Sequence, residues 1–218
     1  MSANGAIRAV LWDFGGVFTT SPFDAFNRYE AEHGLPTDFI RQVNARNPHD
    51  NAWARMERSE IDADAFAGLF EAESRALGHA VNGADILPLL ASDLRPEMVE
   101  ALDHVAARYK TACLTNNVKT GQGPAMARST AKAEAIEAVM ARFDAVIESS
   151  KVGIRKPEPG FYRIACETLG VEPTEAVFLD DLGINLKPAR ELGMTTIKVT
   201  APEQALDELG AVLGLDLR

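Results

Sequence analysis

The sequence predicts an α/β fold: a Rossmann-like parallel sheet core with an inserted α-helical cap domain. Three observations lead to this prediction. Short apolar runs recur without polar interruption, which is typical of strands buried on both faces of a parallel sheet. Amphipathic helical patterns separate the later runs. Roughly ninety residues lie between the first two runs, far more than one crossover helix requires, which indicates an insertion.

The predicted strands and helices follow from the period of the apolar residues. In the segment 96–109, for example, Val99, Leu102 and Val105 recur on one helical face. Strands are predicted at residues 9–12, 111–114, 145–147, 176–179 and 195–199. Helices are predicted at residues 96–109, 130–143, 159–169, 186–192 and 202–213. This alternation predicts a parallel sheet that helices cover on both sides.

The stretch between the first two predicted strands has helical periodicity of its own. We therefore expect residues 18–95 to form the cap domain, and residues 1–17 and 96–218 to form the core. Asp62 is a typical N-cap residue and predicts the start of a helix. The aromatic residues of the insertion, Trp53 among them, are expected to fill its own core. With 7 basic and 13 acidic residues, the insertion is an acidic helical lid.

Composition excludes several classes of protein. The chain has 218 residues, of which 46% are hydrophobic and 25% charged, as expected of a globular protein with a sizeable core. Its net charge of -10 repels polyanions, so we expect no nucleic-acid partner and no anionic membrane partner. No apolar run is long enough to cross a bilayer, and the first residues do not resemble a signal peptide, which predicts a cytoplasmic location.

Cysteine, histidine and glycine patterns do not point to a cofactor. Cys113 and Cys166 are predicted to be buried thiols, because two cysteines in apolar segments form neither a disulfide framework nor a zinc site. The four histidines lack metal-ligand spacing and are expected at the surface. Residues 121–123, Gly-Gln-Gly, are too short a match to a dinucleotide-binding fingerprint and are interpreted as a flexible turn.

Carboxylates follow two of the predicted strands. Asp13 comes directly after the first strand, and Asp180 and Asp181 come after the fourth. Ligands of an open parallel sheet bind at the carboxyl ends of its strands, so these residues are expected to share one edge. Three carboxylates gathered there repel one another unless a cation joins them, and oxygen ligands without histidine favour Mg2+ over zinc. The sequence therefore predicts a magnesium site.

Further polar residues at the same edge suit phosphate chemistry. A carboxylate such as Asp13 can attack phosphorus once the negative charge of the phosphate is neutralised. Lys156 supplies a positive charge, and Thr115 and Asn116, after the second strand, supply hydrogen-bond donors. Each residue alone has an ordinary alternative: Asp13 could cap a helix, Thr115 could merely end a strand, and Lys156 could be a solvated loop charge. Their combination at successive strand ends favours a site.

The order of these residues resembles that of the haloacid dehalogenase superfamily of hydrolases, which carries four short motifs. The matching segments are residues 13–17, Thr115-Asn116, Lys156 and Asp180-Asp181. Residues 148–159 and 178–194 are similar to the N-terminal phosphatase domain of soluble epoxide hydrolases. Residues 53–61 are similar to part of the helical cap that the superfamily places between its first and second motifs.

The resemblance implies a Mg2+-dependent phosphatase of a small-molecule phosphate ester that forms an aspartyl-phosphate on Asp13. Lys156 would hold the phosphoryl oxygens, and Thr115 and Asn116 would donate hydrogen bonds to them. The implied metal ligands are Asp13, the carbonyl of Gly15 and Asp181, with Asp180 nearby and Asn185 in the outer shell. Gly16 and Asn117 are expected to contact the substrate.

Gly15 departs from the phosphatase pattern of that superfamily. The superfamily's phosphatases carry an aspartate at this position, which protonates the leaving alcohol and activates the attacking water. Loss of such a group costs about 10² to 10⁴ in rate. A good leaving group could depart unprotonated, a water relay could carry the proton, or Thr19, Thr20 or Asp24 could supply it. For Thr19 and Thr20, ordinary turn structure is the preferred interpretation.

Three alternatives to a phosphatase follow from the same residues. Gly15 leaves open a catalytically weak or inactive member of the family that binds a phosphate ligand or a partner. A dehalogenase is disfavoured by Asp180-Asp181, because attack on an alkyl halide gains nothing from carboxylates gathered for a cation. A phospho-acceptor receiver is disfavoured by the long insertion. Hydrophobic phosphates and sugar phosphates both stay open as substrates, as do a monomer and a homodimer.

Overall fold

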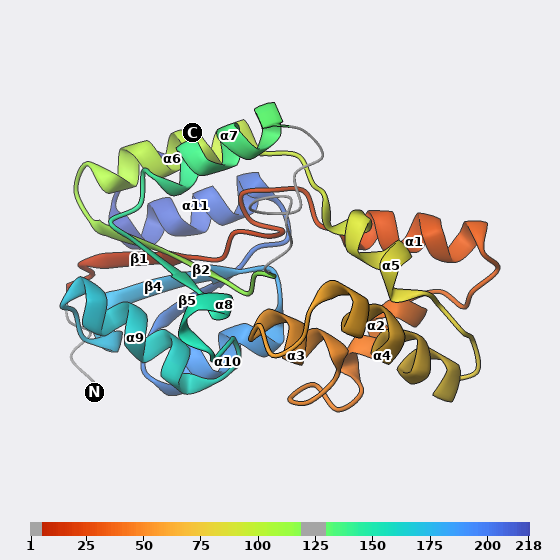
Figure 1. The fold of residues 1–218 in the computed structure, drawn as a ribbon. Coiled ribbons are helices and arrows are strands. Elements are labelled where there is room, and N and C mark those ends of the chain that lie inside the picture. Colours follow the sequence, from red (N-terminus) through yellow and green to blue (C-terminus); the bar gives the residue numbers. More distant parts are fainter. Residues whose placement is uncertain (1–5, 119–129) are drawn as a thin grey trace.

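The sheet consists of parallel strands, as the sequence predicts. The computed structural model describes residues 6–118 and 130–218; the Gly-Gln-Gly segment at 121–123 lies outside them. The five strands lie in the order β3-β2-β1-β4-β5 (Figure 1). Their bounds are Ala9–Trp12 for β1, Lys110–Thr115 for β2, Ala145–Glu148 for β3, Ala176–Asp180 for β4 and Thr195–Lys198 for β5. The predicted α/β class with a Rossmann-like core is confirmed.

Strand β1 occupies the centre of the sheet and pairs in parallel with both β2 and β4. The chain moves outward from β1 to β2 and β3 on one side, and then returns to β4 and β5 on the other. Such a reversal of strand order is where an open α/β sheet forms a ligand-binding crevice, at the carboxyl ends of its strands. Asp13 follows β1, and Asp180 ends β4 beside it.

Two layers of helices bury the sheet. Val10 and Trp12 of β1 belong to the core cluster on one face, and Ala9 and Leu11 belong to the cluster on the other. One layer contains α6 (Pro96–Ala106), α7 (Thr130–Met140) and α11 (Pro202–Leu213), and the other contains α9 (Pro159–Leu169) and α10 (Gly183–Glu191) (Figure 1). Because both faces are covered, the side chains that point to either face of a strand are apolar, which explains the uninterrupted runs.

The predicted bounds differ from the observed ones at several ends. Helix α6 ends at Ala106 instead of residue 109, and α7 ends at Met140 instead of residue 143, because Tyr109 and Phe143 pack on the core from the turns that follow these helices. Helix α10 begins at Gly183 instead of residue 186, because its first turn carries no apolar period. Strands β2 and β4 extend into their polar ends, Thr115 and Asp180. The short helices α8 (Ser149–Val152) and η3 (Pro173–Glu175) were not predicted.

The segment between β1 and β2 folds into helices around a hydrophobic cluster of its own. These elements are α1 (Phe23–Glu32), α2 (Phe39–Ala45), α3 (Ala52–Glu57), α4 (Ala63–Ala76), α5 (Gly83–Ile86) and η1 (Leu87–Leu90). Trp53 is buried against Phe66, with ring centroids 4.9 Å apart, and Asp62 caps α4 by accepting from the Ala65 amide. The division at residues 18 and 95 stays a prediction, and Phe18 packs into the core of the sheet.

The two chain segments that join the insertion to the sheet pair with each other. Thr19 and Leu94 form an antiparallel bridge. The Thr20 amide donates to the Asp93 carbonyl at 2.9 Å, and the Arg95 amide donates to the Phe18 carbonyl at 2.8 Å. The insertion therefore begins and ends at neighbouring points of the core.

Expectations about individual side chains are also met in the described residues. Both cysteines are buried, and all four histidines are exposed. Within residues 6–118 and 130–218, no helix has the length and apolar character that crossing a membrane requires.

Two glycines of the insertion should respond oppositely to alanine. A Cβ at Gly83 would lie 2.7 Å from the Ala67 Cα, in the contact between α5 and α4, so Gly83→Ala should lower the free energy of unfolding by about 1 to 3 kcal/mol. Gly68 lies on the exposed side of α4, where a Cβ meets no atom, so Gly68→Ala should raise it by about 0.5 to 1 kcal/mol. Urea titration of both variants tests this, and shifts of the same sign would contradict it.

Candidate active site

Asp13 lies at the carboxyl end of the central strand and is 7% exposed. Its Oδ1 atom accepts a hydrogen bond from the Phe14 amide at 2.6 Å and lies 2.7 Å from Lys156 Nζ. Both contacts end on the same carboxylate oxygen. One oxygen of Asp13 is thus fixed by a backbone donor and a cation, which orients the carboxylate at the end of the sheet.

Lys156 connects two of the predicted carboxylates. It follows α8 in the chain, is 1% exposed, and lies 2.8 Å from Asp180 Oδ2 as well as 2.7 Å from Asp13. Burial alone would favour the neutral amine, but the charges of Asp13 and Asp180 outweigh it and raise the pKa of Lys156. The lysine is therefore a fixed positive charge between two carboxylates.

The carboxylate of Asp180 is surrounded by donors. Leu182 donates its amide to Oδ1 at 2.8 Å, and the Asn185 side chain donates to both oxygens at 3.0 and 3.1 Å. Asn185 is itself held in place, because its backbone carbonyl accepts a hydrogen bond from the Tyr162 hydroxyl at 2.6 Å. Asp180 thus holds Lys156 in place, and Asn185 acts on the site through Asp180. Tyr162 was not predicted, because its position on α9 resembles that of a core aromatic residue.

Asp181 completes the acidic cluster. Asp13, Asp180 and Asp181 each offer an oxygen, and the three oxygens lie within 4.8 Å of one another. Burial, with the charge of Asp180, raises the pKa of Asp181 to about 6, against the opposing effect of Lys156 and Arg95. Burial likewise raises the pKa of Asp13 well above its usual range, although Lys156 lowers it. Carboxylates this close together repel one another when ionised, and a hard divalent cation such as Mg2+ would offset that repulsion.

Gly15 and Gly16 differ in the space around them. A Cβ at Gly16 would lie 2.4 Å from Asp181 Oδ2, and its φ of +77° is one that other residues rarely adopt. The loop after β1 can approach Asp181 this closely only because residue 16 is glycine. A Cβ at Gly15 would meet no atom within 4 Å, so the position of the missing aspartate is open.

The polar residues at the end of β2 lie at the same edge of the sheet. The side chains of two of them form hydrogen bonds with the protein itself. Asn116 donates its amide to the Lys156 carbonyl at 3.0 Å and accepts from the Lys156 amide at 2.9 Å. Asn117 donates to Glu148 Oε1 at 2.8 Å and accepts from the Ser150 amide at 3.1 Å. These two side chains therefore shape the loop around Lys156. Thr115 ends β2 and is 9% exposed.

The candidates for a substitute proton donor fall into two groups. Thr19 is 1% exposed; its hydroxyl donates to the Thr20 carbonyl and accepts from the Gly16 amide. Thr20 Oγ1 accepts from the Asp93 amide. Both hydroxyls thus stabilise the turn, as preferred from the sequence. Asp24 lies in the exposed first turn of α1.

Arg95 adds a positive charge that sequence reasoning did not include in the site. It lies in the return segment from the insertion and lowers the pKa of Asp181. Its Nη1 atom is buried without a hydrogen-bond partner among the described residues. From the sequence, residues 94–96 indicate a hinge of the insertion and the start of a helix at Pro96, and neither feature points to a role for Arg95 in the site.

Known proteins resemble this chain over most of its length. Residues 7–193 match the haloacid dehalogenase-like hydrolase family. The chain is 34% identical to acyl-CoA dehydrogenase family member 10 of Mus musculus, over 99% of the chain and 20% of that protein. It is 32% identical to bifunctional epoxide hydrolase 2 of Sus scrofa, over 97% of the chain and 40% of that protein. The chain thus spans well under half the length of these two relatives.

A relative of similar length and two solved structures extend the comparison. A phosphatase of Mycobacterium tuberculosis is 32% identical over 95% of the chain and 97% of that protein. A haloacid dehalogenase family enzyme of Bacteroides thetaiotaomicron, in complex with magnesium and inorganic phosphate, has a TM-score of 0.59 at 20% identity and covers 90% of this chain and 96% of its own. The L-2-haloacid dehalogenase of Xanthobacter autotrophicus, with chloropropionic acid covalently bound, has a TM-score of 0.58 at 21% identity and covers 94% and 82%. The two structures share the fold, and the family match shows that this chain belongs to the haloacid dehalogenase-like hydrolases.

Proposed function

We propose that this chain is a Mg2+-dependent phosphatase of a small organic phosphate, with Asp13 as the nucleophile. The observation that carries the proposal is the placement of Asp13 beside Lys156 and within the cluster formed with Asp180 and Asp181. A nucleophilic carboxylate, a fixed cation and further hard oxygen ligands are the parts that phosphoryl transfer requires. The phosphatase from Mycobacterium tuberculosis supports this choice of reaction.

In the first step, an Asp13 oxygen forms a bond to phosphorus and the bond between phosphorus and the leaving oxygen breaks. The Phe14 amide and Lys156 hold Asp13 Oδ1, so the carboxylate has a fixed orientation before the substrate arrives. Lys156 then offsets negative charge on the transferred group. In the second step, a water oxygen forms a bond to phosphorus and the bond between phosphorus and the Asp13 oxygen breaks, which releases inorganic phosphate and restores Asp13. The proton that the water loses balances the proton that the leaving alcohol takes up.

The acidic cluster fits a magnesium ion. Asp13 and Asp181 would be its side-chain ligands, with the Gly15 carbonyl as a third ligand and Asp180 nearby. When bound, Mg2+ would neutralise charge on the phosphate. Asn185 and the Leu182 amide keep Asp180 oriented, and Asp180 in turn keeps Lys156 between the carboxylates.

A dehalogenase is the rival that the comparisons raise, because proteins of that activity share this fold. Both reactions use an aspartate nucleophile, so Asp13 does not separate them. The neighbourhood of Asp13 does: the carbon atom that a dehalogenase attacks carries no negative charge, whereas the phosphoryl group of a phosphate ester does and is stabilised by a cation beside it. The gathering of Asp180 and Asp181 with Asp13 therefore favours the phosphatase.

Turnover of activated substrates with and without metal tests the proposal. Purified protein should hydrolyse p-nitrophenyl phosphate in the presence of Mg2+, lose that activity in EDTA, and lose it in Asp13→Asn. It should release no chloride from 2-chloropropionate. Metal-independent chloride release, or phosphate-ester turnover that survives Asp13→Asn, would overturn the assignment.

The absence of a carboxylate at Gly15 favours one second candidate, a protein that binds phosphate esters without hydrolysing them. The metal ligands and Lys156 would remain competent to bind, while proton transfer to the leaving group would fail. Saturable, Mg2+-dependent binding of a phosphate ester without turnover at high protein concentration would select this function over the phosphatase.

Gly15→Asp should accelerate the hydrolysis of esters with poor leaving groups. The structure leaves room for a side chain at residue 15, and a carboxyl there could protonate the leaving oxygen. We expect a gain of about tenfold or more for alkyl phosphates and little gain for p-nitrophenyl phosphate, whose leaving group departs unprotonated. Gly15→Asn, which fills the space without an acid, is the control. An equal gain in both variants would contradict proton transfer as the cause.

A further inference from the structure

We infer that Glu57 and Arg155 form a latch that seats the helical insertion on the core and thereby positions Lys156; the catalytic consequence rests on the proposed function. Glu57 is the last residue of α3, and Arg155 directly precedes Lys156. Arg155 Nε lies 2.5 Å from Glu57 Oε2, and each side chain is only 15% exposed. The pair is thus a largely buried ion pair between the insertion and the core.

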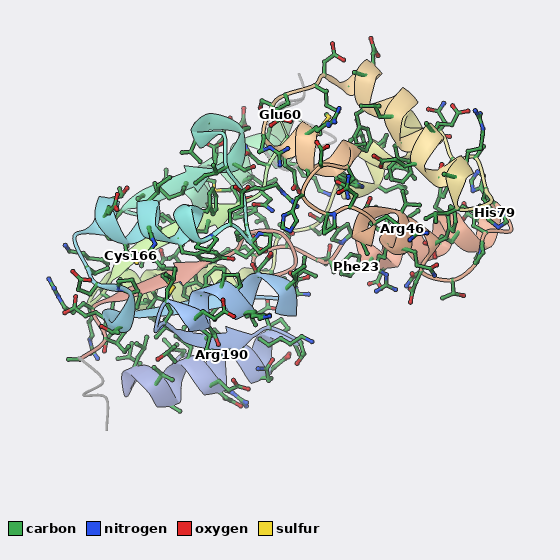
Figure 2. The ribbon with its side chains drawn as sticks, turned by 90° about the horizontal axis from the view of Figure 1, so that it is seen from below. Phe23, Arg46, Glu60, His79, Cys166 and Arg190 are labelled. Atoms are coloured by element: carbon green, nitrogen blue, oxygen red, sulfur yellow. The ribbon has the colours of Figure 1, made fainter. Side chains whose placement is uncertain are left out.

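Hydrogen bonds on both sides of the ion pair join the same two segments, residues 48–59 and 149–155. Arg155 Nη1 donates to the Pro48 carbonyl at 2.9 Å, so one guanidinium holds two points of the insertion. Ser149 donates its hydroxyl to the Glu57 carbonyl at 2.7 Å, and Ser59 donates to the Ser150 carbonyl at 3.3 Å. Figure 1 shows α3 beside α8, and Figure 2 shows Glu60 where the insertion meets the core.

The core segment of this contact is connected to the site. Ser149 is fully buried, and its hydroxyl accepts from the Asn117 amide at 3.0 Å while it donates to Glu57. Asn116 holds the backbone of Lys156 from the other side through the Lys156 amide and carbonyl. Movement of Arg155 would therefore move the backbone that carries Lys156.

A buried ion pair is suited to fixing a position. Taking two charges out of water costs about as much as their attraction returns, so such a pair adds little net stability. Either charge left alone in the interface is unfavourable, which restricts the interface to the arrangement in which the two meet. Lys156 contacts Asp13 and Asp180 at 2.7 and 2.8 Å, so a small displacement would disturb both contacts.

The same helix offers a matched control. Arg55 on α3 pairs with Asp50, with Nε 2.9 Å from Oδ1, but its partner also belongs to the insertion and the two side chains are 39% and 58% exposed. Loss of this pair removes an ion pair of similar geometry without touching the core. Asp50→Asn therefore separates the effect of losing a salt bridge from the effect of opening the latch.

Steady-state kinetics on the full chain give the first test. Glu57→Gln and Arg155→Gln should lower kcat for p-nitrophenyl phosphate by about 10- to 100-fold, with a smaller change in KM, because Lys156 is displaced from its place beside Asp13. The double variant should lose no more than the worse single variant, since either change opens the latch. Glu57→Asp, which keeps the charge, should retain more activity than Glu57→Gln. Independent, multiplying losses, or an equal loss in Asp50→Asn, would overturn the latch.

Hydrogen exchange of the backbone amides tests the latch without any substrate. In Glu57→Gln and Arg155→Gln, amides in both segments, 48–59 and 149–155, and the amide of Lys156 should exchange faster than in the wild type and in Asp50→Asn. Faster exchange confined to 48–59 would show that Glu57 only stabilises the insertion, and would overturn the coupling to Lys156. If the wild type hydrolyses no phosphate ester, the proposed function fails, while this comparison still decides whether the latch exists.

Discussion

Lys156→Met is expected to lower turnover severely and to destabilise the fold at the same time. Lys156 is fully enclosed between Asp13 and Asp180, so its removal leaves two buried carboxylates without their shared cation. Removing one partner of a buried ion pair costs about 3 to 5 kcal/mol, and we expect the free energy of unfolding in metal-free buffer to fall by about that amount. The loss of positive charge beside the transferred phosphate should reduce kcat by about 10³-fold.

Urea titration and the p-nitrophenyl phosphate assay measure the two effects separately. Lys187→Met is the matched control, because Lys187 lies on the exposed side of α10. It removes the same charge and adds the same side chain with no buried partner to lose. Equal unfolding midpoints for the two variants would mean that Lys156 does not compensate the buried carboxylates.

Gly16→Ala is expected to remove Mg2+ binding while leaving the sheet folded. The new methyl group would lie 2.4 Å from Asp181 Oδ2, and the positive φ of residue 16 would become strained. Asp181 can relieve the clash only by turning its carboxylate away from Asp13 and Asp180. We expect Mg2+ affinity to fall by at least about 10- to 100-fold. Isothermal titration with MgCl2 measures this directly.

Gly15→Ala serves as the neighbouring control for that titration. Its added methyl group meets no atom within 4 Å, and the backbone carbonyl of residue 15 is retained. The affinity for Mg2+ should therefore stay within about threefold of the wild type, since metal affinity depends on the ligands and their orientation. Equal losses in the two alanine variants would show that the loop as a whole, and not the approach to Asp181, governs the site.

The sheet and the acidic cluster are both predictable from the order of residues along the chain. Strands buried on both faces appear as continuous apolar runs, and parallel strands bring their carboxyl ends to one edge. The residues that follow the runs, Asp13, Asp180 and Asp181, therefore meet, and the structure places their oxygens within 4.8 Å of one another. No side-chain orientation is needed for that inference.

The direction in which a side chain points could not be predicted from the sequence. Asn116 and Asn117 lie at the expected strand end, but the sequence does not show whether an amide faces a ligand or the backbone of a distant segment. Here both side chains bond to the backbone of the segment that follows β3. Glu30 is similar: it looks like a surface charge on α1, yet it is 1% exposed and accepts from the Asp38 and Ile40 amides near the start of α2. Such contacts depend on how distant segments pack.

Because the segments at Thr19 and Leu94 pair with each other, the helical insertion leaves and re-enters the core at one place. Its first and last residues are hydrogen-bonded neighbours, so a turn of a few residues between Thr20 and Asp93 would close the chain without altering any strand of the sheet. The length of the chain between these points can therefore change without altering the strands, whereas the position of Lys156 depends in addition on the contact between Glu57 and Arg155.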